Sequence, residues 1–254
     1  LQFGAVWLTS GQRTTRIRRA KKILNEGQQL HLYYDENILF SEIQAAELIA
    51  DEGEYSVWRK PCGMYSQGTK WGDHTAICRW IELQGLSLNN RPPRPAFLVH
   101  RLDRATEGLI LVAHSKKAVS LLASLFEQRQ IRKHYRAKVK GQLEDSYLGQ
   151  CICDHIDGKP AKTHILAIHY NADLDESTLE LHIETGRKHQ IRKHLASIGK
   201  PIIGDRLHGI EQQRLSGLDL RLCAYELRFE CPFKLTPQHF KLSQKLAPWI
   251  NLTG

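Results

Sequence analysis

The apolar and polar residues of this chain alternate with two different periods. In residues 133–140 and 179–184, apolar residues alternate with charged residues or histidine. Side chains of a β-strand point alternately to its two faces, so this period of two predicts half-buried strands, the first with a basic outer face. Leu109–Val112 is continuously apolar and contains β-branched residues, which predicts a buried strand.

Two further segments have the period of a helix. Apolar residues at 118, 121, 122 and 125 fall on one helical face, and Ser115 precedes them as an N-cap candidate. They predict an amphipathic helix over 116–129. A second helix is expected from Arg187 to Ile198, with Gly199 ending it because glycine readily adopts the left-handed conformation.

The order of elements predicts an α+β fold. Strands outnumber helices and often follow one another directly, which favours a mixed, largely antiparallel sheet with helices at its faces. Short strands at 4–8 and 29–34 enclose a basic run and could not bury much core alone. We therefore expect a small basic appendage at 1–38, a main domain at 39–254, and a boundary within 38–54. Residues 64–95 are expected to form long loops around one short helix, and such loops are often functional.

Charge points to a polyanionic partner. The 254 residues include 36 Lys and Arg against 27 Asp and Glu, a net charge of +9 with neutral His. This excess favours RNA, DNA or an anionic membrane surface, although a basic protein without such a partner is the alternative. An apolar content of 41% is sufficient for a buried core and argues against wholesale disorder.

Membrane and metal association are not expected. The longest apolar runs, such as Gly108–Ala113, are far below the roughly 20 residues of a bilayer-spanning helix. The start of the sequence lacks the pattern of a signal peptide, and its first residue is not Met. We expect a cytoplasmic protein, monomeric by default. The 6 cysteines form no CxxC pair, and His189 and His194 are not spaced as ligands on one helical face, so no metal is predicted.

Asp103 is the first candidate for chemistry. It lies between Arg101 and Arg104 in a loop that leads into the apolar strand, where Thr106 and Gly108 suit a tight turn. Neighbouring guanidinium groups favour the ionised form of a carboxylate, which can act as nucleophile or base. The alternative is a structural aspartate neutralised by arginines, since structural ion pairs are common.

Two more segments carry candidates. Tyr135 is flanked by cations on its predicted strand, so its ring could stack on a base while the cations hold phosphates; the alternative is a core tyrosine on a solvated strand. Residues 187–194 place four cations and two histidines in the first turns of the expected helix. Cations there oppose the positive end of the helix dipole, so this arrangement favours a bound anion.

Together the three segments resemble the signature motifs of the RluA-type pseudouridine synthases. The motifs are His-Arg-Leu-Asp-x-x-Thr-x-Gly-Leu at 100–109, Lys-x-Tyr-x-Ala-x-Val-x-Gly at 133–141, and Gly-Arg-x-His-Gln-Ile-Arg-x-His-Leu with Gly-x-Pro-Ile-x-Gly-Asp at 186–205. Residues 60–63 and 220–232 are similar to the family's flanking pieces, so the resemblance covers about residues 55–235. Glu107 replaces the more usual Ser, and the appendage resembles a shortened tail of an S4-like RNA-binding module.

The resemblance implies an RNA pseudouridine synthase with the catalytic domain of that family and no cofactor. Asp103 would be the catalytic aspartate, and Arg192 would pair with it and orient it. Tyr135 would stack on the target base and take part in proton movement at C5. Arg101 would contact the RNA backbone or the flipped nucleotide. The other candidates for lining or bracing the pocket are His100, Thr106, Arg187, His189 and Gln190.

The reaction exchanges the N1–C1′ bond of uridine for a C5–C1′ bond and adds no atom. The target base must leave its stack, and Asp103 could attack C1′ or C6 or abstract a ribose proton. Ribosomal RNA and tRNA are both possible substrates, with a compact stem-loop favoured. One alternative function is a non-catalytic RNA-binding or ribosome-assembly protein. Another is a hydrolase, such as a nuclease, that uses His189, His194 and Asp103 and needs a metal or a second carboxylate.

Overall fold

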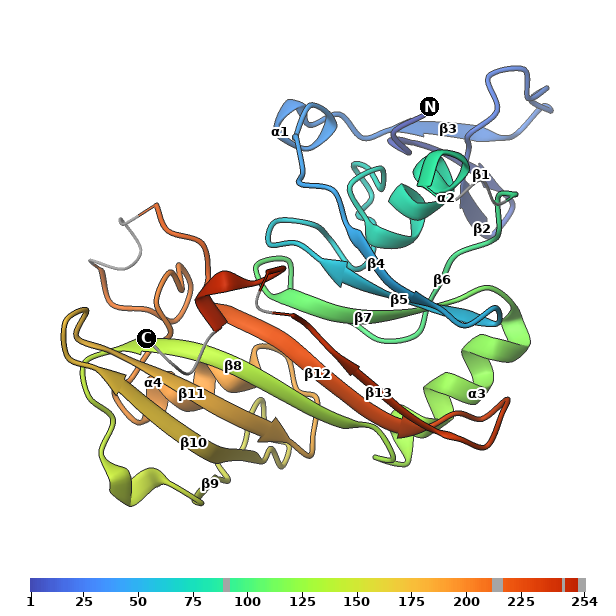
Figure 1. Ribbon diagram of the computed structural model, residues 1–254. Coiled ribbons are helices and arrows are strands. Elements are labelled where there is room, and N and C mark those ends of the chain that lie inside the picture. The colour runs from blue at the N-terminus through green and yellow to red at the C-terminus, as the bar shows by residue number, and fades with distance from the viewer. Residues whose placement is uncertain (89–91, 212–216, 244, 251–254) are drawn as a thin grey trace.

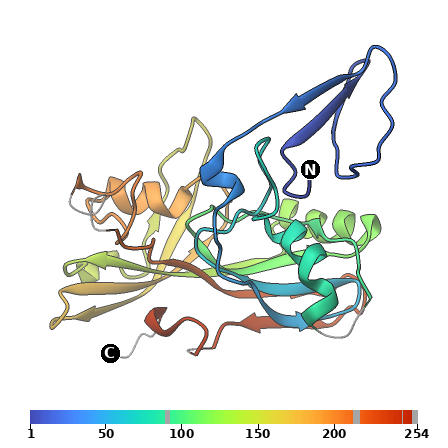
Figure 2. The same ribbon diagram turned by 90° about the horizontal axis from the view of Figure 1, so that it is seen from above.

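A separate three-stranded sheet forms the N-terminal part of the protein. In a computed structural model, which describes residues 1–88, 92–211, 217–243 and 245–250, the strands β1 (Val6–Ser10), β2 (Arg13–Arg16) and β3 (Gln29–Leu32) pair antiparallel in the order β2-β1-β3. We expected two strands around a basic turn, but the first part of the basic run forms β2, where two β-branched threonines favour extended backbone. This sheet projects from the main body of the protein (Figures 1 and 2).

The chain enters the main domain through a short helix. Helix α1 (Glu36–Leu39) begins at Asp35, whose carboxylate accepts a hydrogen bond from the backbone of Asn37. Strand β4 (Glu47–Asp51) follows and is the first strand of the main sheet. The segment 38–54, where we expected a domain boundary, therefore contains both the connection and this strand.

The main domain is built on one large mixed sheet. Its path is β4-β5-β7-β12-β8-β11-β10-β9, with β6 beside β7 and β13 beside β12. The further strands are β5 (Tyr55–Lys60), β6 (Phe97–Leu98), β7 (Glu107–Ala113), β8 (Arg132–Lys140), β9 (Cys151–Ile152), β10 (Thr163–Asn171), β11 (Glu176–Ile183), β12 (Leu222–Glu230) and β13 (Pro237–Lys241). The predicted α+β class with a mixed, largely antiparallel sheet is confirmed (Figure 1).

Helices lie on both faces of this sheet. They are α2 (Ile77–Leu88), α3 (Lys116–Glu127) and α4 (Gln190–Ser197), and short 3₁₀ turns occupy Asp145–Tyr147 and Pro248–Ile250. The long predicted loop region at 64–95 contains α2, while residues 89–91 of it lie outside the described part. None of the helices that the structure describes could span a membrane.

The continuous apolar run of β7 reflects cores on both faces of the sheet. Leu109 and Leu111 pack into one core with α3, whereas Ile110 and Val112 pack into the other core with α2 and α4. A strand covered on both faces has no need of alternation, which explains its sequence pattern. Ser115 caps α3 as predicted, because its hydroxyl accepts a hydrogen bond from the backbone of Ala118.

The two halves of the sheet join where β7 and β12 run parallel. Gly108 faces Ala224 across this junction. Its φ is +122°, and a Cβ atom built on it would lie 2.3 Å from the carbonyl oxygen of Ala224. Only glycine allows this approach. The approach brings the loop before β7 next to β12 and β8, and so defines where the candidate site forms.

Two cations on the basic outer face of β8 have carboxylate partners. The Arg136 guanidinium lies 3.4 Å from the Glu180 carboxylate, and the Lys138 ammonium lies 3.3 Å from that of Glu176. Both acids belong to β11, the antiparallel neighbour of β8. Cross-strand ion pairs thus use two of its cations, and phosphate contacts by the other cations of the strand stay a prediction.

Candidate active site

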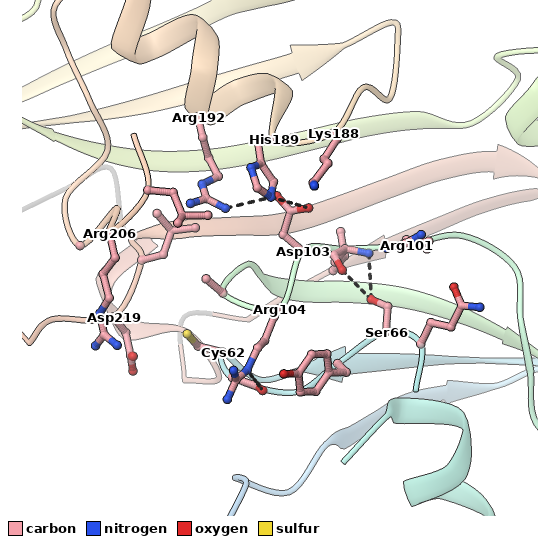
Figure 3. Close-up of a pocket in the computed structure, with 18 of the residues that line it drawn as sticks. Cys62, Ser66, Arg101, Asp103, Arg104, Lys188, His189, Arg192, Arg206 and Asp219 are labelled. Carbon is pink, nitrogen blue, oxygen red and sulfur yellow. Dashed lines mark hydrogen bonds and ion pairs between the residues drawn. The ribbon is translucent and has the colours of Figure 1, made fainter. Parts of the chain in front are cut away.

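A pocket of about 590 Å³ opens where four loops meet the start of α4. The segments are residues 62–67, 101–105, 188–192, 204–207 and 218–220. A smaller pocket of about 90 Å³ adjoins it, and Arg101, Asp103 and Arg192 line both. Figure 3 shows Asp103 in the larger pocket, with Arg192 and His189 reaching toward it from the start of α4.

Backbone hydrogen bonds fix the loop that carries Asp103. The Ser66 hydroxyl donates to the Leu102 carbonyl at 2.6 Å and accepts from the Leu102 amide at 3.0 Å. The amide of Thr106 donates to the carbonyl of Asp103, which closes a tight turn as the sequence predicts. The loop is thus held at both ends, and the carboxylate projects from a rigid support.

Lys60 stabilises the loop that carries Asp103 through buried hydrogen bonds. Its side chain is fully buried, and its ammonium nitrogen lies within hydrogen-bond distance of the carbonyl oxygens of Pro61, Met64 and Arg104. Burial lowers the pKa of Lys60 to about 7. Lys60 lies in one of the flanking pieces of the family pattern, but no periodicity or spacing in the sequence indicates this role.

Asp103 is approached by residues distant in sequence. Its side chain is 29% exposed, and its two carboxylate oxygens lie 3.7 Å from Arg192 Nη1 and 3.9 Å from His189 Nε2. Arg104 instead turns to the Gly63 carbonyl and the Tyr65 ring. The cation next to the Asp103 carboxylate is therefore Arg192 and not its sequence neighbour Arg104. The carboxylate stays accessible from the pocket.

Asp205 holds Arg192 in place. Arg192 Nε and Nη2 donate to the two carboxylate oxygens of Asp205 at 2.8 and 2.6 Å, and both side chains are buried. Burial alone would raise the pKa of Asp205, but hydrogen bonds from Arg192 and from the backbone of Leu207 and His208 hold it below its usual value. Arg192 thus has a fixed guanidinium with one free nitrogen, Nη1, toward Asp103.

The helix that carries Arg192 begins later than predicted. It starts at Gln190, and His189 is its N-cap in the left-handed conformation, with φ of 56°. Arg187 and Lys188 therefore precede the helix. Lys193 pairs with Asp157 at 2.9 Å. Two of the four expected cations, Arg192 and Lys193, therefore lie in the first helical turn, and both have carboxylate partners.

His189 lies beside a second histidine, His208, which no motif in the sequence singles out. His189 Nδ1 is 3.0 Å from His208 Nε2, so one ring donates a hydrogen bond to the other. Burial lowers the pKa of both rings, although Asp103 partly opposes this for His189. Both imidazoles are therefore expected to be neutral near neutral pH.

Tyr135 lies on β8 and lines the smaller pocket together with Thr106. Its side chain is 8% exposed, so the ring is largely core while one edge faces the pocket. Burial, and then the nearby charge of Asp103, raise the pKa of Tyr135. Its hydroxyl is therefore protonated at neutral pH and can donate a hydrogen bond to a molecule in the pocket.

Gln190 and His100 have internal partners. The amide of Gln190 is hydrogen-bonded to Thr185, Thr163 and the backbone around them, which fixes the turn before α4. His100 lies outside both pocket linings. Its Nε2 accepts from the Leu111 amide at 3.0 Å and its ring stacks on Phe126, so it supports the loop from behind.

Five cationic side chains line the larger pocket against two carboxylates, Asp103 and Asp219. Such a rim favours an anionic ligand. Arg187 reaches the smaller pocket and donates to the Pro160 carbonyl. Glu107 is absent from both linings, because it is buried against Arg59 at 2.9 Å. The five cations are Arg101, Arg104, Lys188, Arg192 and Arg206.

No cluster of three or more His, Cys, Asp or Glu residues suited to a metal ion occurs in the described ranges. The histidines near the site instead contact each other, since His189 and His208 share a hydrogen bond. The two pockets therefore offer the carboxylates of Asp103 and Asp219, a fixed guanidinium, a protonated phenol and neutral imidazoles.

Comparison with known proteins gives a consistent match. Residues 54–197 match the family model of RNA pseudouridylate synthases. An uncharacterized RNA pseudouridine synthase of Aquifex aeolicus is 29% identical over 247 residues, which cover 86% of this chain and 76% of the relative. The dual-specificity RNA pseudouridine synthase RluA of Vibrio parahaemolyticus is 34% identical over 204 residues, with coverage of 73% and 78%.

Other relatives are matched over a smaller part of their length. The chain spans 39% of the ribosomal large subunit pseudouridine synthase D of Nitrosomonas europaea, with 42% identity over 140 residues. The solved structure of human RNA pseudouridylate synthase domain containing 1 has a TM-score of 0.63 at 19% identity, with coverage of 83% of this chain and 88% of the human one. At that identity the likeness concerns the fold alone.

Proposed function

The chain belongs to the RNA pseudouridylate synthase family, of the RluA type, and from this premise we propose that it isomerises particular uridines of a folded RNA with Asp103 as the catalytic carboxylate. The observation that carries the proposal is the position of Asp103. Its carboxylate faces the common wall of two pockets, 3.7 Å from a guanidinium that Asp205 holds rigid.

The two pockets can bind different parts of the RNA around a flipped nucleotide. The uracil and ribose of the target occupy the space between Asp103 and Tyr135, and the neighbouring phosphates contact the cationic rim. Extrusion of a base from its stack costs a few kcal/mol, which these contacts offset. Relatives named for ribosomal RNA, for tRNA and for dual specificity support both RNA classes as substrates.

The chemistry needs no external atom. The N1–C1′ bond breaks, the uracil turns, C5 bonds to C1′, the C5 proton leaves and N1 gains a proton. Asp103 acts on C1′, on C6 or on a ribose proton, and each of these routes starts from an ionised carboxylate. Arg192 Nη1 orients Asp103 and stabilises its charge. The Tyr135 ring stacks on the base and its hydroxyl takes part in proton movement at C5.

Mapping of pseudouridines in cells tests this function directly. Cells that lack the protein are compared with the same cells carrying wild type or Asp103→Asn. We expect one or a few uridines of ribosomal RNA or tRNA to lose the modification and only wild type to restore it. Unchanged maps in spite of normal expression would make a non-catalytic RNA-binding protein the better description.

Tyr135→Phe is expected to slow turnover about 100-fold, because a positioned proton donor or acceptor typically contributes a factor of this order. The ring keeps its packing, so melting temperature and RNA affinity should stay near wild-type values. Release of tritium from RNA labelled at uridine C5 measures the rate. A wild-type rate would reduce Tyr135 to a core residue.

Lys188→Ala is expected to weaken RNA binding and to lower the slope of log affinity against log salt by about 0.7–0.9, the effect of one lost phosphate contact. Lys188 is exposed at the pocket. The matched control is Lys117→Ala on the exposed surface of α3, which should leave the slope unchanged. Equal slopes for wild type and both variants would remove Lys188 from the RNA interface.

A further inference from the structure

One face of the N-terminal sheet carries aromatic and cationic side chains in register. Trp7 on β1 lies opposite Arg16 on β2 and His31 on β3. Alternate residues of a strand share a face, so Tyr33, two residues after His31, continues this row. The rings of His31 and Tyr33 are stacked, with centroids 6.4 Å apart and an angle of 17° between their planes.

The three strands contribute no negative charge to this face, and the carboxylate that binds its Arg16 comes from Asp73 of the main domain. Strands β1, β2 and β3 contain no Asp or Glu. The Arg16 guanidinium lies over the Trp7 ring at 4.4 Å. The next row of the face is polar, where the Thr9 hydroxyl lies 2.8 Å from both the Thr14 hydroxyl and His31 Nε2. Such a surface favours a negatively charged partner that offers flat apolar groups.

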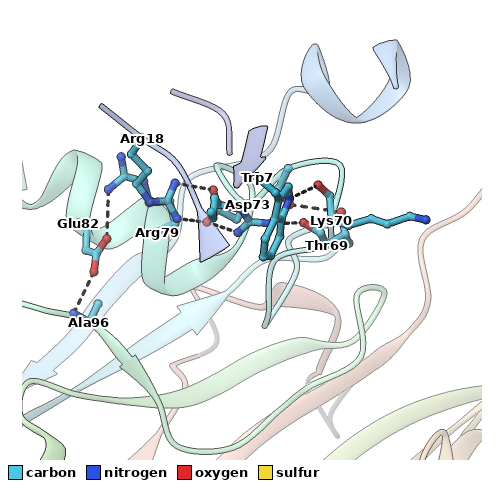
Figure 4. Close-up of polar contacts among 10 residues, drawn as sticks. Trp7, Arg18, Thr69, Lys70, Asp73, Arg79, Glu82 and Ala96 are labelled. Carbon is cyan, nitrogen blue, oxygen red and sulfur yellow. Dashed lines mark hydrogen bonds and ion pairs between the residues drawn. The ribbon is translucent and has the colours of Figure 1, made fainter. Parts of the chain in front are cut away.

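A loop of the main domain completes the face. Lys70 and Trp71 lie in the loop before α2, and both are exposed. The Lys70 ammonium is 4.5 Å from the Trp71 ring centroid and 5.1 Å from that of Tyr33. One cation therefore lies between two aromatic rings from different parts of the chain, and Figure 4 shows its side chain extending away from Asp73.

The loop and the sheet are fixed to each other. Trp7 Nε1 donates to the Lys70 carbonyl at 2.8 Å. Arg16 and Arg18 both bind the carboxylate of Asp73, which is buried. A Cβ atom at Gly4 would lie 2.3 Å from that carboxylate, so the contact leaves no space for another residue. The face is thus pre-organised, which lowers the ordering cost of binding.

The same loop leads into the candidate active site. Its first residues, Tyr65, Ser66 and Gln67, line the pocket that contains Asp103. The Arg104 guanidinium lies 4.7 Å from the Tyr65 ring centroid, so cation and aromatic alternate here too. The loop therefore provides a short route over described residues from the pocket to the N-terminal sheet.

We propose that a single-stranded segment of the RNA next to the target nucleotide follows this loop and binds the N-terminal aromatic face. Unpaired bases would stack on Trp71 and Tyr33, and phosphates would contact Lys70. Duplex RNA hides its base faces and could use the cations alone, so the aromatic rings favour a single strand. The inference rests on the proposed function for its direction of approach. The face consists of Trp7, Arg16, His31, Tyr33, Lys70 and Trp71.

Binding of two labelled probes to the full chain tests the proposal. The probes are an oligouridine single strand and a blunt RNA duplex of the same length. Combined Tyr33→Ala and Trp71→Ala should weaken single-strand binding by about tenfold or more, the typical effect of lost base stacking, and leave duplex binding unchanged. Combined Tyr33→Phe and Trp71→Phe should retain wild-type affinity. The matched control is Tyr170→Ala, a tyrosine that is 40% exposed on β10.

Photochemical crosslinking gives a second readout that needs no variant. Oligouridine containing 5-iodouridine reacts with nearby aromatic side chains on irradiation. We expect adducts on the tryptic peptides Trp71–Arg79 and Ile23–Arg59, which contain the two rings. Wild-type affinity of the alanine variant, equal weakening in Tyr170→Ala, or equal loss for the duplex would each overturn the proposal. These outcomes are independent of the pseudouridine map, so the surface and the activity can fail separately.

Discussion

Asp103→Asn is expected to lower the rate of pseudouridine formation by a factor on the order of 10⁴ or more, as when a catalytic nucleophile or base is removed from other enzymes. The amide is nearly isosteric but carries no charge, so it can neither attack carbon nor accept a proton. Because Asp103 is 29% exposed and its ion pair with Arg192 is long, at 3.7 Å, the fold should tolerate the change.

The measurement is single-turnover tritium release from RNA labelled at uridine C5, beside the affinity of the same RNA. RNA affinity should stay within a few-fold of wild type. Asp219→Asn is the matched control, since it removes a carboxylate from the same pocket away from Arg192, and its cost should be far smaller. Parallel losses of activity and binding in Asp103→Asn would argue against a catalytic role.

Asp205→Ala is expected to destabilise the protein by about 3–5 kcal/mol, because it leaves the buried Arg192 guanidinium without its partner. The two side chains are 0% and 3% exposed, so water cannot replace the lost carboxylate. Arg192 would then be free to turn onto Asp103, and turnover should fall as well. Chemical denaturation measures the first effect, and tritium release at a temperature where the variant is folded measures the second.

An exposed ion pair made by another residue of α4 provides the comparison. Lys193 pairs with Asp157 at 2.9 Å, but Asp157 is exposed. Exposed pairs often contribute nothing measurable, so Asp157→Ala should denature at the wild-type concentration of denaturant. Equal stabilities for Asp205→Ala and wild type would mean that the buried pair serves only to orient Arg192.

The pairing of Arg192 illustrates the limit of sequence reasoning. The motif identifies Arg192 and Asp103 as neighbours, and the structure brings them to 3.7 Å. The tighter partner is Asp205, which the same motif contains at its end. Its role depends on how residues 199–205 fold back against α4, and no periodicity in the sequence encodes that return.

Charge patterns were harder to interpret than apolar ones. The alternation of β8 predicts its strand and the burial of Tyr135, and both agree with the structure. The fate of its cations depends on the register with β11, which places Arg136 opposite Glu180. The register depends on the whole sheet, so the sequence of a basic segment does not show which of its cations have carboxylate partners. The third strand of the N-terminal sheet was missed because its arginines suggested a turn.

The central place of β12 in the sheet affects folding during synthesis of the chain. This strand follows both β7 and β8 in the chain by about a hundred residues, yet it lies between them in the sheet. Until Glu230 has left the ribosome, β7 and β8 each present an unpaired edge, a template for pairing with another chain. A nascent chain therefore passes through a stage in which the two halves of its main sheet are not yet joined.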